Sequence, residues 1–123
     1  MVYLHRRQKA LDLLAKLDLD ALVFCQPENI HYLCGFSGSD GVLIVFSDQL
    51  VFLTDSRYTT QSNEEVTADL VCEYKLKVDG VIDQLSMHGV NSIGFEAGVS
   101  FGLVNELQKK GRGDWQWLPL KDE

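Results

Sequence analysis

The sequence lacks any long uninterrupted apolar run and any large cluster of basic residues. No stretch approaches the roughly 18 apolar residues that a membrane-spanning helix needs, and the N-terminus lacks the charged-then-apolar order of a signal peptide. The net charge is −7, and only Arg6-Arg7 and Lys109-Lys110 place two cations side by side, whereas nucleic-acid binding needs clustered lysine and arginine. We therefore expect a cytoplasmic protein that binds neither a membrane nor a nucleic acid.

Cysteine and histidine are scarce and irregularly spaced. Cys25, Cys34 and Cys72 form an odd set without a C-x-x-C pair, which is typical of reduced thiols rather than of a disulfide framework. Histidines stand only at positions 5, 31 and 88, far from any metal-ligand spacing, so we expect no metal and no cofactor in this chain. The 123 residues are 46% hydrophobic and 24% charged, which indicates one globular domain.

Helical periodicity alternates with short β-branched runs along the chain. The periodicity predicts helices over 4–17, 27–33, 78–85 and 101–110, with a further one from a cap at Asp55 or Ser56 through Glu65. Apolar runs predict strands over 21–25, 42–46, 51–53, 70–74, 92–95 and 115–118. The turn at 47–49 requires an antiparallel hairpin, while helices between the other strands imply parallel crossovers. The predicted fold class is α/β, with a mixed sheet and flanking helices.

This pattern also predicts where several side chains lie. Phe101, Val104 and Leu107 are expected to face the interior from a helix capped by Ser100 and ended by Gly111. Cys25 and Cys72 are expected in the core because they lie in apolar strands. The tail at 121–123 follows the last strand without a helix or turn, which predicts a chain cut at a domain boundary.

Glycines recur at three-residue spacing in the stretch from Asn29 to Tyr58. Gly35, Gly38 and Gly41 predict a loop with backbone angles that only glycine adopts easily. A nucleophile elbow, G-x-S-x-G, would need glycine where Ser39 stands and a strand before the loop. The P-loop lysine and the G-x-G-x-x-G spacing are missing too. A tight loop is favoured over a nucleophile site or a phosphate site.

Asp55 and Arg57 directly follow an apolar strand. Polar residues at the carboxyl edge of an open α/β sheet often contact ligands. The alternative is that Asp55 caps the next helix and that Arg57 pairs with it.

Four segments together resemble a known family: residues 20–23, 27–30, 32–39 and 54–58, which read DALV, PENI, YLCGFSGS and TDSRY. They resemble the creatinase/prolidase-type N-terminal domain that precedes the metallopeptidase half of Xaa-Pro aminopeptidases and Xaa-Pro dipeptidases. The likeness covers essentially the whole chain. It implies a ribonuclease-H-like α/β layout that performs no chemistry alone, so the full-length protein would be a hydrolase and this chain inactive.

The resemblance also implies partners and a site. In that family a C-terminal pita-bread catalytic domain, absent from this chain, binds two divalent metals, commonly manganese or cobalt. Implied partners are that domain, a second subunit in a homodimer and a proline-containing peptide substrate. The positions that match the family motif, and that are candidates for the substrate entrance or an interface, are His31, Tyr32, Phe36, Ser37, Ser39, Asp55, Arg57 and Tyr58.

Two positions depart from the family pattern, and two other functions stay open. Ser56 stands where relatives often carry glycine, and Cys34 where they often carry threonine. The same fold also suits a stand-alone binding module, or the N-terminal domain of a creatinase-type amidinohydrolase.

Overall fold

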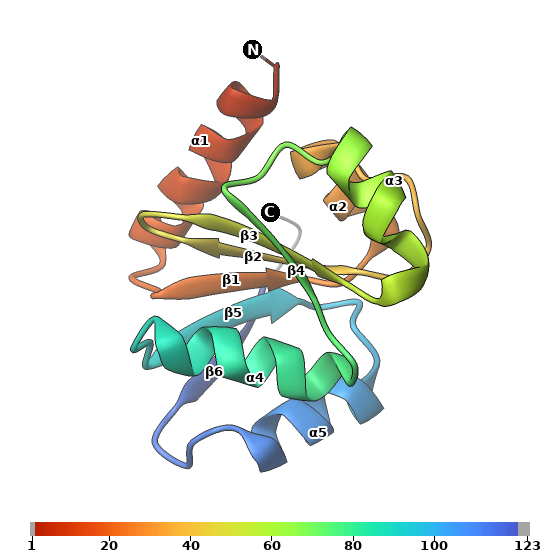
Figure 1. The fold of residues 1–123 in the computed structure, drawn as a ribbon. Helices are drawn as coiled ribbons and strands as arrows, with labels where there is room; N and C mark the ends of the chain where they lie inside the picture. Colours follow the sequence, from red (N-terminus) through yellow and green to blue (C-terminus); the bar gives the residue numbers. More distant parts are fainter. Residues whose placement is uncertain (1, 121–123) are drawn as a thin grey trace.

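The computed structural model describes residues 2–120, in which helices and strands alternate in the predicted order (Figure 1). The helices are α1 (Val2–Lys16), α2 (Pro27–Cys34), the 3₁₀ turn η1 (Ser56–Tyr58), α3 (Thr59–Glu65), α4 (Lys77–Met87) and α5 (Phe101–Lys110). The strands are β1 (Ala21–Phe24), β2 (Val42–Phe46), β3 (Leu50–Thr54), β4 (Leu70–Glu73), β5 (Ser92–Glu96) and β6 (Gln116–Leu120). The prediction of which elements form is confirmed, with bounds that shift by a few residues.

The six strands form one mixed sheet in the order β4-β3-β2-β1-β5-β6. β2 is antiparallel to both of its neighbours, β1 and β3, whereas the pairs β3–β4, β1–β5 and β5–β6 are parallel. The predicted hairpin between β2 and β3 closes where the Phe46 N–H donates to the Gln49 carbonyl at 2.8 Å. A single reversed strand in a sheet of this order agrees with the ribonuclease-H-like layout that the resemblance implied.

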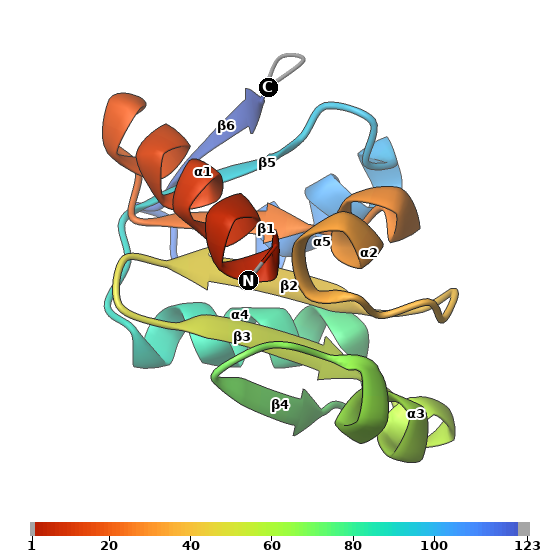
Figure 2. The same ribbon diagram turned by 90° about the horizontal axis from the view of Figure 1, so that it is seen from above.

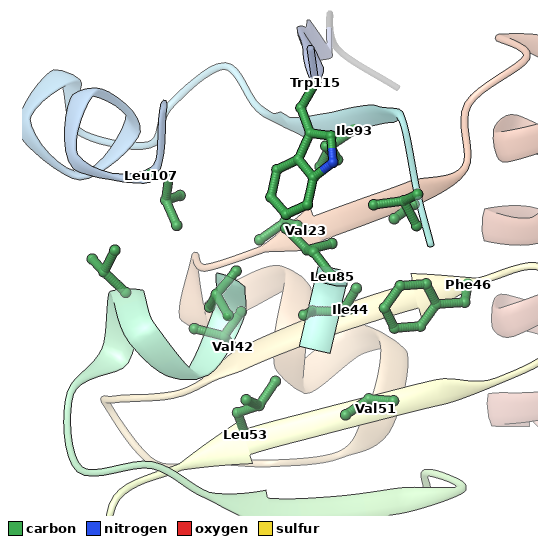
Figure 3. Packing of buried hydrophobic residues seen from close by; sticks show 14 of the residues in the cluster. Val23, Val42, Ile44, Phe46, Val51, Leu53, Leu85, Ile93, Leu107 and Trp115 are labelled. Atoms are coloured by element: carbon green, nitrogen blue, oxygen red, sulfur yellow. The ribbon is translucent and has the colours of Figure 1, made fainter. Parts of the chain in front are cut away.

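Helices cover both faces of the sheet, with α1, α2 and α3 on one side and α4 and α5 on the other (Figures 1 and 2). Successive side chains of a strand point to opposite faces, so Val42 and Ile44 join the cluster under α4 and α5 while Leu43 joins the cluster under α1 and α2. Figure 3 shows the first cluster, where Leu85 of α4 lies against Ile44 and other strand residues. Covering on both faces explains why β1, β2 and β3 are buried along their whole length and are apolar at every position except Thr54.

Local signals end the helices where the sequence indicated. Pro27 occupies the first turn of α2, and Gly35 ends the helix in the left-handed conformation, with φ of 89° and its N–H donating to the His31 carbonyl. Gly89, just after α4, is left-handed as well, with φ of 65°. Ser100 caps α5 by accepting a hydrogen bond from the Leu103 N–H at 3.2 Å.

The predicted inward position of Phe101 is wrong, because its side chain is 82% exposed. α5 packs on the core through Leu103 and Leu107, and a residue two positions before Leu103 points away from that face. Leu107 is buried as predicted.

Cys25 and Cys72 are half-buried and pack against the first core cluster, so their predicted place in the core is correct only in part. Cys25 lies one residue beyond β1, and Cys72 lies on β4, at an edge of the sheet. The tail at 121–123 falls outside the described residues. Between residues 2 and 120 there is no helix with the length and apolar character that a membrane crossing requires.

Candidate functional site

Two segments from the family-like stretch meet at one edge of the sheet. One is the glycine loop, residues 35–41, which connects α2 to β2; the other is the DSRY segment, residues 55–58, which follows β3. Because β2 runs against β1 and β3, its first residue lies at the edge where those strands end. The topology therefore brings the glycine loop and the DSRY segment together.

Phe36 anchors the glycine loop to the core. Its side chain is 1% exposed, and its ring centroid lies 4.7 Å from that of Phe52 and 5.6 Å from that of Tyr58. The Tyr58 ring meets Phe36 edge-on at 89°, a favourable geometry for two aromatic rings. The expectation that Phe36 lines an entrance or an interface is therefore corrected: its ring lies beneath the loop and supports it.

Only one glycine of the loop needs the backbone angles that the sequence predicted. Gly35 has positive φ, but Gly38 and Gly41 do not. They are required for space instead, since a Cβ atom at Gly38 would lie 2.3 Å from the Phe36 ring and one at Gly41 would lie 2.8 Å from the Phe52 ring. The loop is tight, as predicted, because it is wrapped over two aromatic side chains.

Hydrogen bonds fasten the glycine loop to η1 and α3. The hydroxyl oxygens of Ser39 and Tyr58 are 2.8 Å apart. Ser37 donates to the carboxylate of Glu65 from its N–H at 2.9 Å and from its hydroxyl at 3.0 Å, and Gln61 donates to the same carboxylate at 3.1 Å. The hydrogen bond from the Ser37 N–H, followed by that from Gln61, lowers the pKa of Glu65.

A cluster of four charged side chains lies beside the loop. The guanidinium of Arg57 donates to Asp55 at 2.7 Å and to Asp40 at 3.3 Å, and the ammonium of Lys77 lies 2.5 Å from Asp40. Asp55 also accepts from the Arg57 backbone N–H at 2.9 Å, and so caps η1. The alternative in which Asp55 caps and Arg57 pairs with it is confirmed. The Arg57 side chain nevertheless remains 68% exposed, whereas that of Asp55 is 20% exposed.

His31 and Tyr32 lie on α2, apart from this cluster. Tyr32 is 43% exposed, and the guanidinium carbon of Arg6 lies 4.2 Å from the centroid of its ring. Arg6 also donates to the Tyr32 carbonyl at 2.8 Å, which ties α2 to α1. The His31 side chain is exposed. Of the eight candidates, the structure brings Phe36, Ser37, Ser39, Asp55, Arg57 and Tyr58 into one continuous set of contacts.

Glu96 is a buried carboxylate that sequence reasoning missed. Its side chain accepts hydrogen bonds from the N–H groups of Cys25 and Gln26 and from the side-chain amide of Asn29, the last at 2.6 Å. Burial raises its pKa although these donors oppose the rise. Glu96 thus fixes the start of α2 to the end of β5. The sequence feature that could have pointed to Glu96 is the same one that pointed to Asp55, namely a carboxylate at the end of an apolar strand.

The chemistry of the remaining side chains is limited. Burial raises the pKa of Cys25 to about 12 and that of Cys34 to about 11, so both thiols are protonated at neutral pH and neither is an activated nucleophile. No three His, Cys, Asp or Glu side chains between residues 2 and 120 are grouped in a way that could hold a metal ion.

Comparison with known families identifies the domain. Residues 6–123 match the family model of the Creatinase/Prolidase N-terminal domain, and the chain belongs to this family. The family and the α/β fold class implied by the resemblance are confirmed.

Individual relatives include peptidases that are much longer than this chain. The peptidase YqhT of Bacillus subtilis is 29% identical over 90 residues, which are 72% of this chain and 26% of YqhT. The Xaa-Pro dipeptidase of Pyrococcus horikoshii is 25% identical over 105 residues, 84% of this chain and 28% of the dipeptidase. The chain spans about a quarter of the length of these curated relatives.

A solved structure matches over nearly the full chain. The N-terminal domain of the cytoplasmic peptidase PepQ from Mycobacterium tuberculosis is 31% identical, with a TM-score of 0.85 over 95% of this chain and 93% of that domain. This chain is therefore similar to the N-terminal domains of Xaa-Pro peptidase-type proteins.

The carboxyl group of Asp55 should titrate below its ordinary pKa of 3.8, because hydrogen bonds from Arg57 favour the charged form. A pKa lowered by folding gives a contribution to stability that is present above the unfolded pKa and is lost as the pH falls through the folded pKa. NMR titration of the carboxyl carbon should show the pKa of Asp55 rising in Arg57→Ala and unchanged in Lys109→Ala. An Asp55 pKa that is the same in Arg57→Ala as in the unaltered chain would contradict this assignment.

Proposed function

We propose that this chain is the N-terminal, non-catalytic domain of a cytoplasmic Xaa-Pro peptidase, and that its glycine loop and DSRY segment form part of the substrate entrance and of a subunit contact. The observation that carries the proposal is the exposed guanidinium of Arg57, which the ion pair with Asp55 and the neighbouring glycine loop hold in place. Membership in the Creatinase/Prolidase N-terminal family and the longer peptidase relatives support it.

Arg57 suits the recognition of a carboxylate. A guanidinium presents several N–H donors in a planar fork, and a carboxylate of a peptide or of a second subunit accepts two of them at once. Asp55 and Asp40 engage one side of the fork, so a ligand would approach from the exposed side. Ser37 and Ser39, both exposed, add hydroxyl groups on the same loop.

In this proposal the peptide bond is cleaved outside the chain described. A C-terminal catalytic domain with two divalent metals, manganese or cobalt, would activate water and stabilise the developing negative charge. The domain described here would cover the mouth of that site, its own or that of the partner in a homodimer. The substrate class is a peptide with proline after the scissile bond.

Residues 1–123 alone should not hydrolyse an Xaa-Pro dipeptide, even with added Mn²⁺, because no metal-binding group of side chains and no activated nucleophile occurs among residues 2–120. Proline release should stay at background while the Xaa-Pro dipeptidase of Pyrococcus horikoshii, assayed in parallel, is active. Turnover that survives repurification and disappears in His31→Ala or Cys34→Ala would overturn the non-catalytic assignment.

In a protein that joins this domain to the catalytic half, Arg57→Ala should raise KM or weaken dimerisation and leave the metal content unchanged. Loss of one charge-assisted contact corresponds to about a tenfold change or more. Arg112→Ala is the matched control, since Arg112 is equally exposed and its only ion pair in the described chain joins it to Asp114, two residues away. Kinetics, sedimentation and metal analysis provide the readouts. A fall in bound metal, or equal effects of the two variants, would show that the role given to Arg57 is wrong.

A further inference from the structure

A groove of about 740 Å³ lies between α1, α2 and the ends of β1 and β5, away from the glycine loop. In Figure 2, α1 and α2 stand over β1 and β2, while β5 and β6 extend past α1 without a described helix above them. The floor is apolar, made by the buried side chains of Ala10, Phe24, Leu33 and Leu120. A hollow of this size with an apolar floor is typical of a binding surface.

Cations follow the α1 side of this groove. Arg6, Lys9 and Lys16 all line it, and ten residues of helix separate the first from the last, a distance of ~15 Å. Both lysines are exposed. Asp12, the acidic residue that α1 places on the same side, accepts a hydrogen bond from Gln8 at 2.9 Å. The chain as a whole has a net charge of −7, whereas this row of cations makes the α1 side of the groove locally positive.

The far side of the groove is polar. Glu96 lines it, but its carboxylate oxygens already accept from Cys25, Gln26 and Asn29. Gly98 packs so closely that a Cβ atom there would lie 2.3 Å from the side-chain nitrogen of Gln26. The side-chain amides of Gln26 and Asn29 therefore lie at the wall of the groove, where they are placed to meet the polar backbone of a bound chain.

We propose that this groove binds an acidic, partly apolar peptide segment of a separate protein. The cations are spread along ~15 Å, which matches several residues of extended chain better than one compact anion. Carboxylates would pair with Arg6, Lys9 and Lys16 while apolar side chains cover Phe24 and Leu33. A second copy of this chain fits poorly, because a two-fold contact across the groove would set the cations of one α1 against those of the other.

The test uses fluorescence anisotropy with a labelled peptide of alternating glutamate and leucine, about six residues long so that it spans the groove. Two matched peptides, alternating lysine with leucine and glutamate with serine, separate the charged from the apolar contribution. The double variant Lys9→Glu/Lys16→Glu reverses the charge of the groove. The control, Lys75→Glu/Lys109→Glu, makes the same change in net charge at exposed lysines that do not line it.

Saturable binding of the glutamate–leucine peptide is expected, weakened about tenfold or more in Lys9→Glu/Lys16→Glu and little changed in the control. Binding should also fall with added salt. Amide resonances of Gln26, Asn29 and Gly98 should shift on titration, which places the peptide in the groove. No saturable binding, equal loss in both double variants, equal binding of the lysine–leucine peptide, or self-association through α1 in sedimentation would each overturn the proposal.

Discussion

The packing of the Phe36 ring is the contact on which the candidate site depends. The ring fills the space beneath Gly38 and touches Phe52 from β3 and Tyr58 from η1. Burial of an apolar side chain such as this ring is what restricts the conformation of the loop. Each surface hydrogen bond contributes little to the free energy of folding by comparison. The hydrogen bonds of Ser37 and Ser39 then only need to set the orientation of a loop whose position the ring has already determined.

The reversed direction of β2 determines what lies next to that loop. It places the entry into β2 beside the exit from β3, so Asp40 from one segment and Asp55 from the other flank Arg57. Lys77, at the start of α4, adds a second cation on Asp40. Exposed ion pairs of this kind stabilise a fold only slightly, so orienting the guanidinium is their more substantial effect. An exposed guanidinium held in one orientation is what the proposed accessory role requires of this edge.

The sequence was sufficient for the elements and their order because the signals that determine them are local. Apolar runs, helical spacing, Pro27, Gly35 and Gly89 act on their immediate neighbours, and the single polar turn at 47–49 was enough to require an antiparallel pair. The position of Phe101 was predicted wrongly because helical spacing alone does not determine which face of a short helix points to the core. Choosing Leu103 instead as the inward residue depends on where α5 meets the sheet.

The candidate site was predicted only in part. The cap by Asp55 and its pairing with Arg57 are local and were foreseen, whereas the contacts of Arg57 with Asp40, of Lys77 with Asp40 and of Ser37 with Glu65 join segments that are far apart in the chain. The Phe36 ring reaches its place beneath Gly38 by packing on Phe52 from β3, and the three donors that meet Glu96 come from a segment 67–71 residues away in the chain. Such contacts have no signature in a single stretch of sequence.

The most direct test of the central contact is the free energy of unfolding of Gly38→Ala, measured with urea. An added methyl group would meet the buried Phe36 ring, so we expect a loss of about 1–3 kcal/mol, and a smaller loss when Phe36→Leu is already present. Gly102→Ala is the matched control, because a Cβ atom there meets nothing within 4 Å and alanine favours the helix. Equal stability of Gly38→Ala and the unaltered chain would contradict the claim that the Phe36 ring fixes the glycine loop.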